Sequence, residues 1–126
     1  MDFTTTLDKE KKRIVVKSKC VIDNQCVHLI RAEIKSYLKS NNGWDVLVDH
    51  SESTLDPLHY SDMTFVSAET ASQFAPFNIR RFALVVNEAD YGVGRMWEIL
   101  IRDKTSTSAR VFKTVEEAIR FLDGPD

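Results

Sequence analysis

The sequence has no apolar run long enough to cross a membrane. Its longest uninterrupted aliphatic and aromatic stretch covers residues 82–86, whereas a transmembrane helix needs about 20 consecutive apolar residues. The opening residues, Met1 to Thr4, form no apolar signal segment. These two absences argue against a membrane span and against export, so we expect a cytoplasmic protein.

Glycine and proline, which often mark loops and linkers, are scarce, with four and three copies in 126 residues. They are spread thinly, and the sequence contains no repeat, low-complexity tract or linker-like stretch. A chain of this length buries roughly two-thirds of its unfolded surface, enough for one hydrophobic core without a metal or a disulfide. We therefore expect residues 1–126 to form a single domain.

Cysteine and histidine are too few, and too irregularly spaced, to predict a metal site. Cys20 and Cys26 match neither the C-x-x-C redox motif nor the paired clusters of structural zinc. The three histidines form no ligand pattern. We predict no metal and no cofactor. Both thiols are expected to pack as small hydrophobic groups, with a disulfide as the less favoured alternative.

The chain also has no excess of basic charge. Its 17 basic and 19 acidic side chains give a formal net charge of -2, which provides no general attraction to nucleic acid or anionic lipid. The densest basic cluster, Lys9 to Arg13, includes an acid and lacks interleaved aromatic residues. We interpret this cluster as a solvated hairpin turn, and we expect no nucleic-acid partner.

Apolar residues occur in patterns typical of an α/β fold. Five segments show strand-like alternation or short continuous apolar runs, and four have apolar residues at helical spacing. The runs at residues 46–48 and 82–86 are typical of strands that are buried on both faces, as in a parallel sheet. The predicted strands are residues 3–7, 13–22, 44–49, 82–86 and 109–112.

Capping residues place the starts of the predicted helices. Asp23 or Asn24 caps the first helix, the pair Asp56-Pro57 starts the second, and a capping box at Thr114 starts the last. The element order is β-β-α-β-α-β-α-β-α. Because strand-helix-strand crossovers lay helices over parallel strands, we predict an α/β protein with a mixed, mostly parallel five-stranded sheet and about four helices. The last helix is expected to bury Val115, Ala118, Ile119 and Leu122.

Asp49, His50 and Ser51 are the three residue types of an acyl-transfer triad, but they are adjacent in the sequence. Consecutive side chains on a strand point to opposite faces, so the three cannot align as nucleophile, base and orienting acid. No G-x-S-x-G nucleophile elbow occurs, and we predict no catalytic residues. Open α/β sheets nonetheless bind ligands at the carboxyl ends of their strands, which makes the stretch from Asp49 to Thr54 the best candidate site.

The segment from Tyr91 to Arg95, with glycine at positions 92 and 94, follows a predicted strand and opens a predicted helix. This is the location of a dinucleotide-binding loop. Trp97 stands where that motif needs its third glycine, and no phosphate-binding G-K-[ST] motif follows. We expect the two glycines to permit a tight helix start while Trp97 packs in the core. Arg95 remains a candidate for holding an anion, and Tyr91 joins it as a candidate site residue.

Four segments together resemble the SpoIIAA-like (STAS/SEC14-type) family over nearly the whole chain. They are a strand ending in Asp49, the apolar strand at residues 81–86, a Tyr-Gly-x-x-Arg-Met helix start at residues 91–96, and a Val-Phe-x-x-x-Glu-Glu-Ala segment within residues 110–118. The resemblance implies a small bacterial cytosolic domain with four helices against a five-stranded sheet and no established catalytic residues. The sequence departs from the family at Cys20, where relatives usually carry glycine before the first helix.

The resemblance also suggests possible phosphorylation sites. Anti-sigma-factor antagonists of the related STAS class change partners when a serine at a helix start is phosphorylated. Ser51 and Ser53 are the possible phosphosites here, with Thr54 as a further hydroxyl, although the Asp-Ser-Ser-Gly motif of that class is absent. A phosphate at a helix N-terminus is stabilised by the helix dipole and repels an acidic partner surface.

Two functions stay open at this point. The first is a non-enzymatic regulatory or protein-interaction domain that presents the loop from Asp49 to Thr54, and the adjoining helix, to an unknown protein partner. The alternative is a small-molecule- or lipid-binding module with an apolar cleft between residues 63–74 and the sheet. The SEC14 likeness suggests a lipid-like carboxylate as its ligand. A homodimer is compatible with both. The candidate partner or ligand residues are Asp49, His50, Ser51, Ser53, Thr54, Tyr91 and Arg95.

Overall fold

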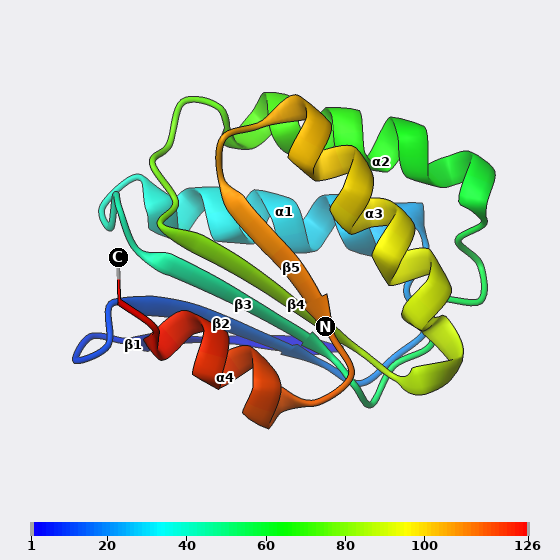
Figure 1. Cartoon of the computed structure of the whole chain (residues 1–126), viewed down its shortest axis with the longest axis horizontal. Coiled ribbons are helices and arrows are strands. Elements are labelled where there is room, and N and C mark those ends of the chain that lie inside the picture. The colour runs from blue at the N-terminus through cyan, green and yellow to red at the C-terminus, as the bar shows by residue number, and fades with distance from the viewer. Residues whose placement is uncertain (1, 126) are drawn as a thin grey trace.

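The computed structural model describes residues 2–125, which form a five-stranded sheet covered by four α-helices (Figure 1). The strands lie in the order β1-β2-β3-β4-β5; β1 is antiparallel to β2, and the other neighbouring pairs are parallel. The predicted α/β class, element order and mostly parallel sheet are confirmed. The elements are β1 (Phe3–Asp8), β2 (Arg13–Ser18), α1 (Asn24–Leu38), β3 (Asp45–His50), α2 (Tyr60–Phe74), β4 (Arg81–Val86), the 3-10 helix η1 (Glu88–Asp90), α3 (Tyr91–Lys104), β5 (Ser108–Phe112) and α4 (Val115–Asp123).

Helices cover both faces of the sheet. α1, α2 and α3 lie on one face, and α4 lies on the other (Figure 1). Because strand side chains alternate between faces, β3 contributes to two cores: Val46 and Val48 pack in the larger core beneath α1, α2 and α3, whereas Leu47 packs beneath α4. This explains why the central strands are continuously apolar. No helix within residues 2–125 has the length and apolar character to cross a bilayer.

Strand β2 ends at Ser18 rather than at Ile22, so the predicted strand was too long. The chain leaves the sheet here because the N–H of Cys20 donates to Ser53 Oγ at 3.1 Å. Beyond this point Val21 forms only an isolated bridge. The apolar alternation continues past the strand because Ile22 is still buried in the larger core.

Helix α2 begins at Tyr60, and the predicted start at Asp56 and Pro57 is wrong. Those two residues lie in a turn instead. The helix starts where the carboxylate of Asp62 accepts the N–H of His59 at 2.8 Å, which satisfies one of the free donors at the helix end. The helix cap involving Asp62, rather than the earlier pair Asp56-Pro57, therefore sets the start of α2.

Helix α4 begins after Thr114, as predicted, and Thr114 Oγ1 accepts the N–H of Glu117 at 3.2 Å. The predicted buried stripe is wrong at Ile119, which is 38% exposed. Phe121 is more buried instead, and its ring centroid lies 5.4 Å from that of Phe112 on the edge strand β5. The helix is thus rotated so that this aromatic pair covers the sheet margin.

Arginines at the amino ends of the strands hold the end of α4. Arg80 donates to the carbonyl oxygens of Leu122 and Gly124, which have no partner within the helix. The Asp45 carboxylate in turn accepts two hydrogen bonds from Arg80, at 2.9 and 3.1 Å. This polar network lies at the edge of the sheet opposite the candidate site and has a structural role.

Candidate functional site

The loop that follows β3 carries most of the predicted site residues. Asp49 and His50 end the strand, at the carboxyl edge of the parallel sheet. The chain then turns through Ser51, and the N–H of Ser53 donates to the carbonyl of His50 at 3.0 Å. Thr54 follows and bridges to the segment after β2. The structure therefore brings these five predicted residues together in one compact loop.

A chain of buried hydroxyl groups fixes the His50 ring. Ser18 Oγ lies 2.6 Å from His50 Nδ1 and 2.6 Å from Ser53 Oγ, and Ser53 Oγ accepts the N–H of Cys20. A neutral ring satisfies these contacts, for example when Ser53 donates to Ser18 and Ser18 donates to Nδ1. Burial lowers the pKa of His50 to about 4, against the opposing attraction of Asp49. The ring is therefore neutral near pH 7.

The three adjacent residues Asp49, His50 and Ser51 do not form a triad. Asp49 Oδ1 accepts the backbone N–H of Ser51 at 2.9 Å, while the hydroxyl that contacts the His50 ring belongs to Ser18. Ser18 is only 1% exposed, and its hydroxyl is already engaged. This serine-histidine contact is inaccessible, and no carboxylate of residues 2–125 is hydrogen-bonded to the ring. The contact therefore lacks the arrangement used for acyl transfer.

The two serines considered for phosphorylation differ in accessibility. Ser53 is buried, and its hydroxyl belongs to the network around His50. Ser51 is partly exposed in a turn. Because α2 begins at Tyr60, neither serine lies at the start of a helix, and the helix-dipole argument for a phosphate does not apply to them.

Asn87 and Asp90, between β4 and α3, tie the loop in place. Asn87 Nδ2 donates to the carbonyl of Ser53 at 2.8 Å and to Asp90 Oδ2 at 2.9 Å. The same carboxylate oxygen of Asp90 accepts the N–H of Leu55 at 3.0 Å. Sequence reasoning missed both residues, although their position directly after a buried parallel strand was an available signal.

Tyr91 and Arg95, the remaining predicted site residues, have other contacts. Arg95 donates to the buried carboxylate of Glu98, which also accepts the N–H of Val111 at 2.7 Å. Lys113 Nζ lies 4.8 Å from the ring centroid of Tyr91, within the range of a cation–π contact. The guanidinium that the sequence left available for an anion therefore already has an acidic partner within the chain.

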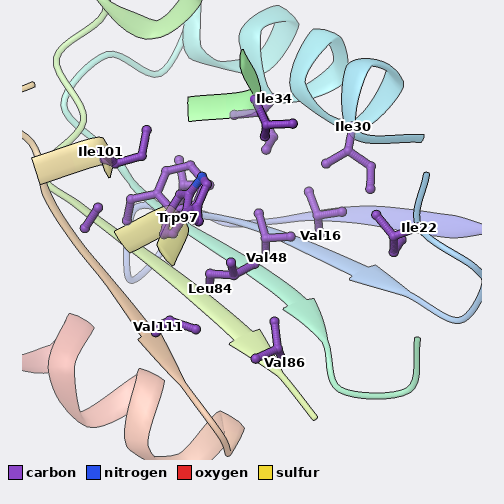
Figure 2. Packing of buried hydrophobic residues seen from close by; sticks show 14 of the residues in the cluster. Val16, Ile22, Ile30, Ile34, Val48, Leu84, Val86, Trp97, Ile101 and Val111 are labelled. Carbon is purple, nitrogen blue, oxygen red and sulfur yellow. The ribbon is translucent and has the colours of Figure 1, made fainter. Parts of the chain in front are cut away.

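An apolar cavity of about 80 Å³ lies between the sheet and helices α1, α2 and α3. It occupies the place of the apolar cleft predicted between residues 63–74 and the sheet. Figure 2 shows Val48 and Leu84 of the sheet facing the side chains of α1, with Trp97 of α3 beside them, and these three residues line the cavity. His50 also lines it, at the end of β3. The cavity thus reaches the end of β3, where the candidate loop begins.

Arg31 of α1 is the one charged residue in the cavity lining, and sequence reasoning missed it. It is 6% exposed, and its Nε atom has no hydrogen-bond partner. Burial lowers the pKa of its guanidinium, while the charge of Glu69 opposes that change. A signal was available: Arg31 follows Val27 by four residues and precedes Ile34 by three, the spacing of one helix face.

Comparison with known proteins defines the fold. No model of a known protein family matches the sequence, and no curated protein matches it. A solved structure from Shewanella loihica PV-4, described as an uncharacterized protein from the DUF3478 family with a SpoIIAA-like fold, superposes with a TM-score of 0.59. The match covers 95% of this chain and 93% of that chain, at 12% sequence identity.

This chain has a SpoIIAA-like fold. The fold predicted from the resemblance is confirmed. At this identity the likeness establishes the architecture alone, so a function for the SpoIIAA-like domain has to be argued from its own residues.

Proposed function

We propose that this SpoIIAA-like domain is a non-enzymatic module that binds a small, largely apolar ligand in the cavity between the sheet and helices α1, α2 and α3. The supporting observation is the cavity itself, with its nearly continuous apolar wall. Interiors are normally packed with few voids larger than a water molecule, and concave apolar sites with a few polar groups are typical ligand sites. The inaccessible Ser18 hydroxyl supports the non-enzymatic part of the proposal.

The size of the cavity restricts the ligand. A cavity of about 150 Å³ accommodates the six carbons of benzene, so the present volume of about 80 Å³ suits a group of about three or four carbon atoms. A long lipid chain does not fit this volume without rearrangement. The proposal therefore favours a small molecule over a lipid.

Trp97 provides a direct test because its indole lines the cavity. We expect 1-butanol to change the fluorescence of Trp97 saturably in a Trp44→Phe background, which removes the second tryptophan. Val66→Phe, which fills the cavity, should abolish this response. Val21→Phe adds the same bulk at an exposed position and should leave the response unchanged. Circular dichroism must show that both variants are folded. A response that does not saturate, or that survives Val66→Phe, would contradict the proposal.

Exposed aromatic residues favour a second candidate, a regulatory domain that binds a protein partner through α2. Tyr60 and Phe65 on this helix are 58% and 66% exposed, and exposed apolar surface of this kind can contribute to a protein-interaction site. A partner that binds here should be recovered from native lysate in stoichiometric amount by the wild-type domain and lost with Phe65→Ser. Equal recovery by both proteins would contradict this candidate.

A further inference from the structure

Arg31 is a buried cation that lacks a counter-ion. Its Nε atom has no hydrogen-bond partner, and no ion pair joins its guanidinium to a carboxylate of residues 2–125. Removing a guanidinium from water is strongly unfavourable unless an anion and hydrogen bonds compensate for the lost hydration. Because Arg31 also lines the apolar cavity, a cationic side chain with an unpartnered, buried Nε atom borders the cavity.

Glu69 of α2 does not supply this compensation. Its charge partly offsets the lowering of the Arg31 pKa by burial, so it attracts the guanidinium. The Glu69 carboxylate, however, is partly exposed and accepts a hydrogen bond from Gln73 Nε2 at 3.3 Å. Glu69 therefore acts on Arg31 from beyond ion-pairing distance.

The other polar groups of the cavity carry no charge. Thr70 Oγ1 donates to the carbonyl of Val66 at 2.8 Å and is satisfied within α2. The His50 ring is neutral near pH 7, with Nδ1 bonded to Ser18. The cavity consequently combines an apolar wall with one positive charge, which is complementary to a small molecule with an aliphatic body and one anionic group.

We propose that the ligand of this cavity is a short aliphatic carboxylate, with its carboxylate paired to the Arg31 guanidinium and its chain of about three or four carbons among the apolar residues. This inference rests on the function proposed above and adds the chemical class of the ligand. Arg31 acts as the binding residue for the charged group, and the wall formed by residues such as Val48 and Trp97 selects the size of the chain.

Butyrate and 1-butanol are matched probes because they have the same chain length and differ in charge. Their dissociation constants can be measured at pH 7.5 and constant ionic strength from Trp97 fluorescence in the Trp44→Phe background. We expect butyrate to bind about tenfold more tightly than 1-butanol, since a hydrogen bond to a charged group contributes at least this factor. Arg31→Met should remove this preference and leave the affinity for 1-butanol within about twofold.

A variant one turn further along α1 is the matched control. Lys35→Met removes a cation that is hydrogen-bonded to Gln73 and does not line the cavity, so the preference for butyrate should persist. Glu69→Gln removes a negative charge near the site and should tighten the binding of butyrate.

The possible results separate the two proposals. Equal affinities of the wild-type protein for both probes, or a preference for butyrate that survives Arg31→Met, would overturn the assignment of a carboxylate to Arg31 and leave the apolar-ligand function standing. Weaker binding of butyrate to Glu69→Gln would also overturn it, because an anion paired with Arg31 is expected to bind more tightly once the negative charge of Glu69 is removed. Failure of both probes to bind would overturn the proposed function together with this inference.

Discussion

Lowering the pH from 7 to 5 is expected to destabilise the fold through His50. The ring is buried beside Ser18 in a network that is satisfied by the neutral imidazole. Protonation of the ring would place a positive charge in a region with little access to water. His50→Asn, which keeps a polar side chain without a titrating group, is expected to remove this part of the acid sensitivity.

The magnitude follows from the difference between the folded and unfolded pKa of His50. The folded-state pKa is lowered from 6.5 to about 4, so the unfolded chain takes up the proton first as the pH falls. The stabilisation is fully present above pH 6.5 and is lost progressively toward pH 4. At about 1.4 kcal/mol for each pKa unit, the loss between pH 7 and pH 5 is about 2 kcal/mol.

Urea denaturation at the two pH values provides the assay. Carboxylates contribute to acid sensitivity in every variant, so the informative quantity is the difference between the losses of the wild type and of His50→Asn. His28→Asn makes the same replacement at an exposed histidine and should behave as the wild type. Equal losses in the wild type and in His50→Asn would refute the reasoning. An NMR titration of the His50 ring in the wild-type protein tests the pKa directly and needs no variant.

Three further predictions concern buried charges and thiols. Asp45→Ala is expected to cost about 3 kcal/mol of unfolding free energy, because it removes a buried carboxylate from Arg13 and from Arg80. A loss below about 1 kcal/mol in urea denaturation would contradict this. Cys26 should react with iodoacetamide at pH 8 much more slowly in the native protein than in the urea-unfolded chain, because burial raises the pKa of its thiol to about 12. Equal reaction rates of the native and unfolded proteins, measured by mass spectrometry, would contradict this prediction. Glu98→Ala should be at least about 1 kcal/mol less stable than Glu98→Gln, since glutamine keeps an acceptor for the N–H of Val111; equal denaturation midpoints would contradict it.

Features of the fold that depend on local patterns were predictable from the sequence. The apolar runs within β3 and β4 identify strands buried on both faces, and the cap at Thr114 identifies the start of α4. The end of β2 was not predictable, because it depends on a hydrogen bond from Cys20 to Ser53, which is distant in the sequence. The start of α2 was misplaced because the side chain of Asp62 provides a stronger start than the turn before it.

The site was predictable only in part for the same reason. His50 was a candidate because it follows a buried strand at the edge where parallel sheets bind ligands. Its contact with Ser18 depends on the parallel register of β2 and β3, which sets Lys17 opposite Asp49. That register is a feature of the tertiary structure, so the contact between His50 and Ser18 could not be predicted from local sequence patterns. Arg31 differs from Ser18, because its place within an apolar helical stripe is visible in the sequence and was overlooked.

The two arginines that are less than a tenth exposed within residues 2–125, Arg13 and Arg31, show why the charge of the ligand matters. Arg13 lies 2.7 Å from a carboxylate oxygen of Asp123 and 3.5 Å from one of Asp45. Burial of a guanidinium requires such compensation, and for Arg13 the chain supplies it. The Nε atom of each arginine lacks a hydrogen-bond partner, but within residues 2–125 only Arg13 has an ion pair, whereas Arg31 lines an apolar cavity. An anion from outside the chain would compensate the positive charge of Arg31, as Asp45 and Asp123 compensate that of Arg13. The charge of a small molecule, as well as its size, should therefore decide whether it binds.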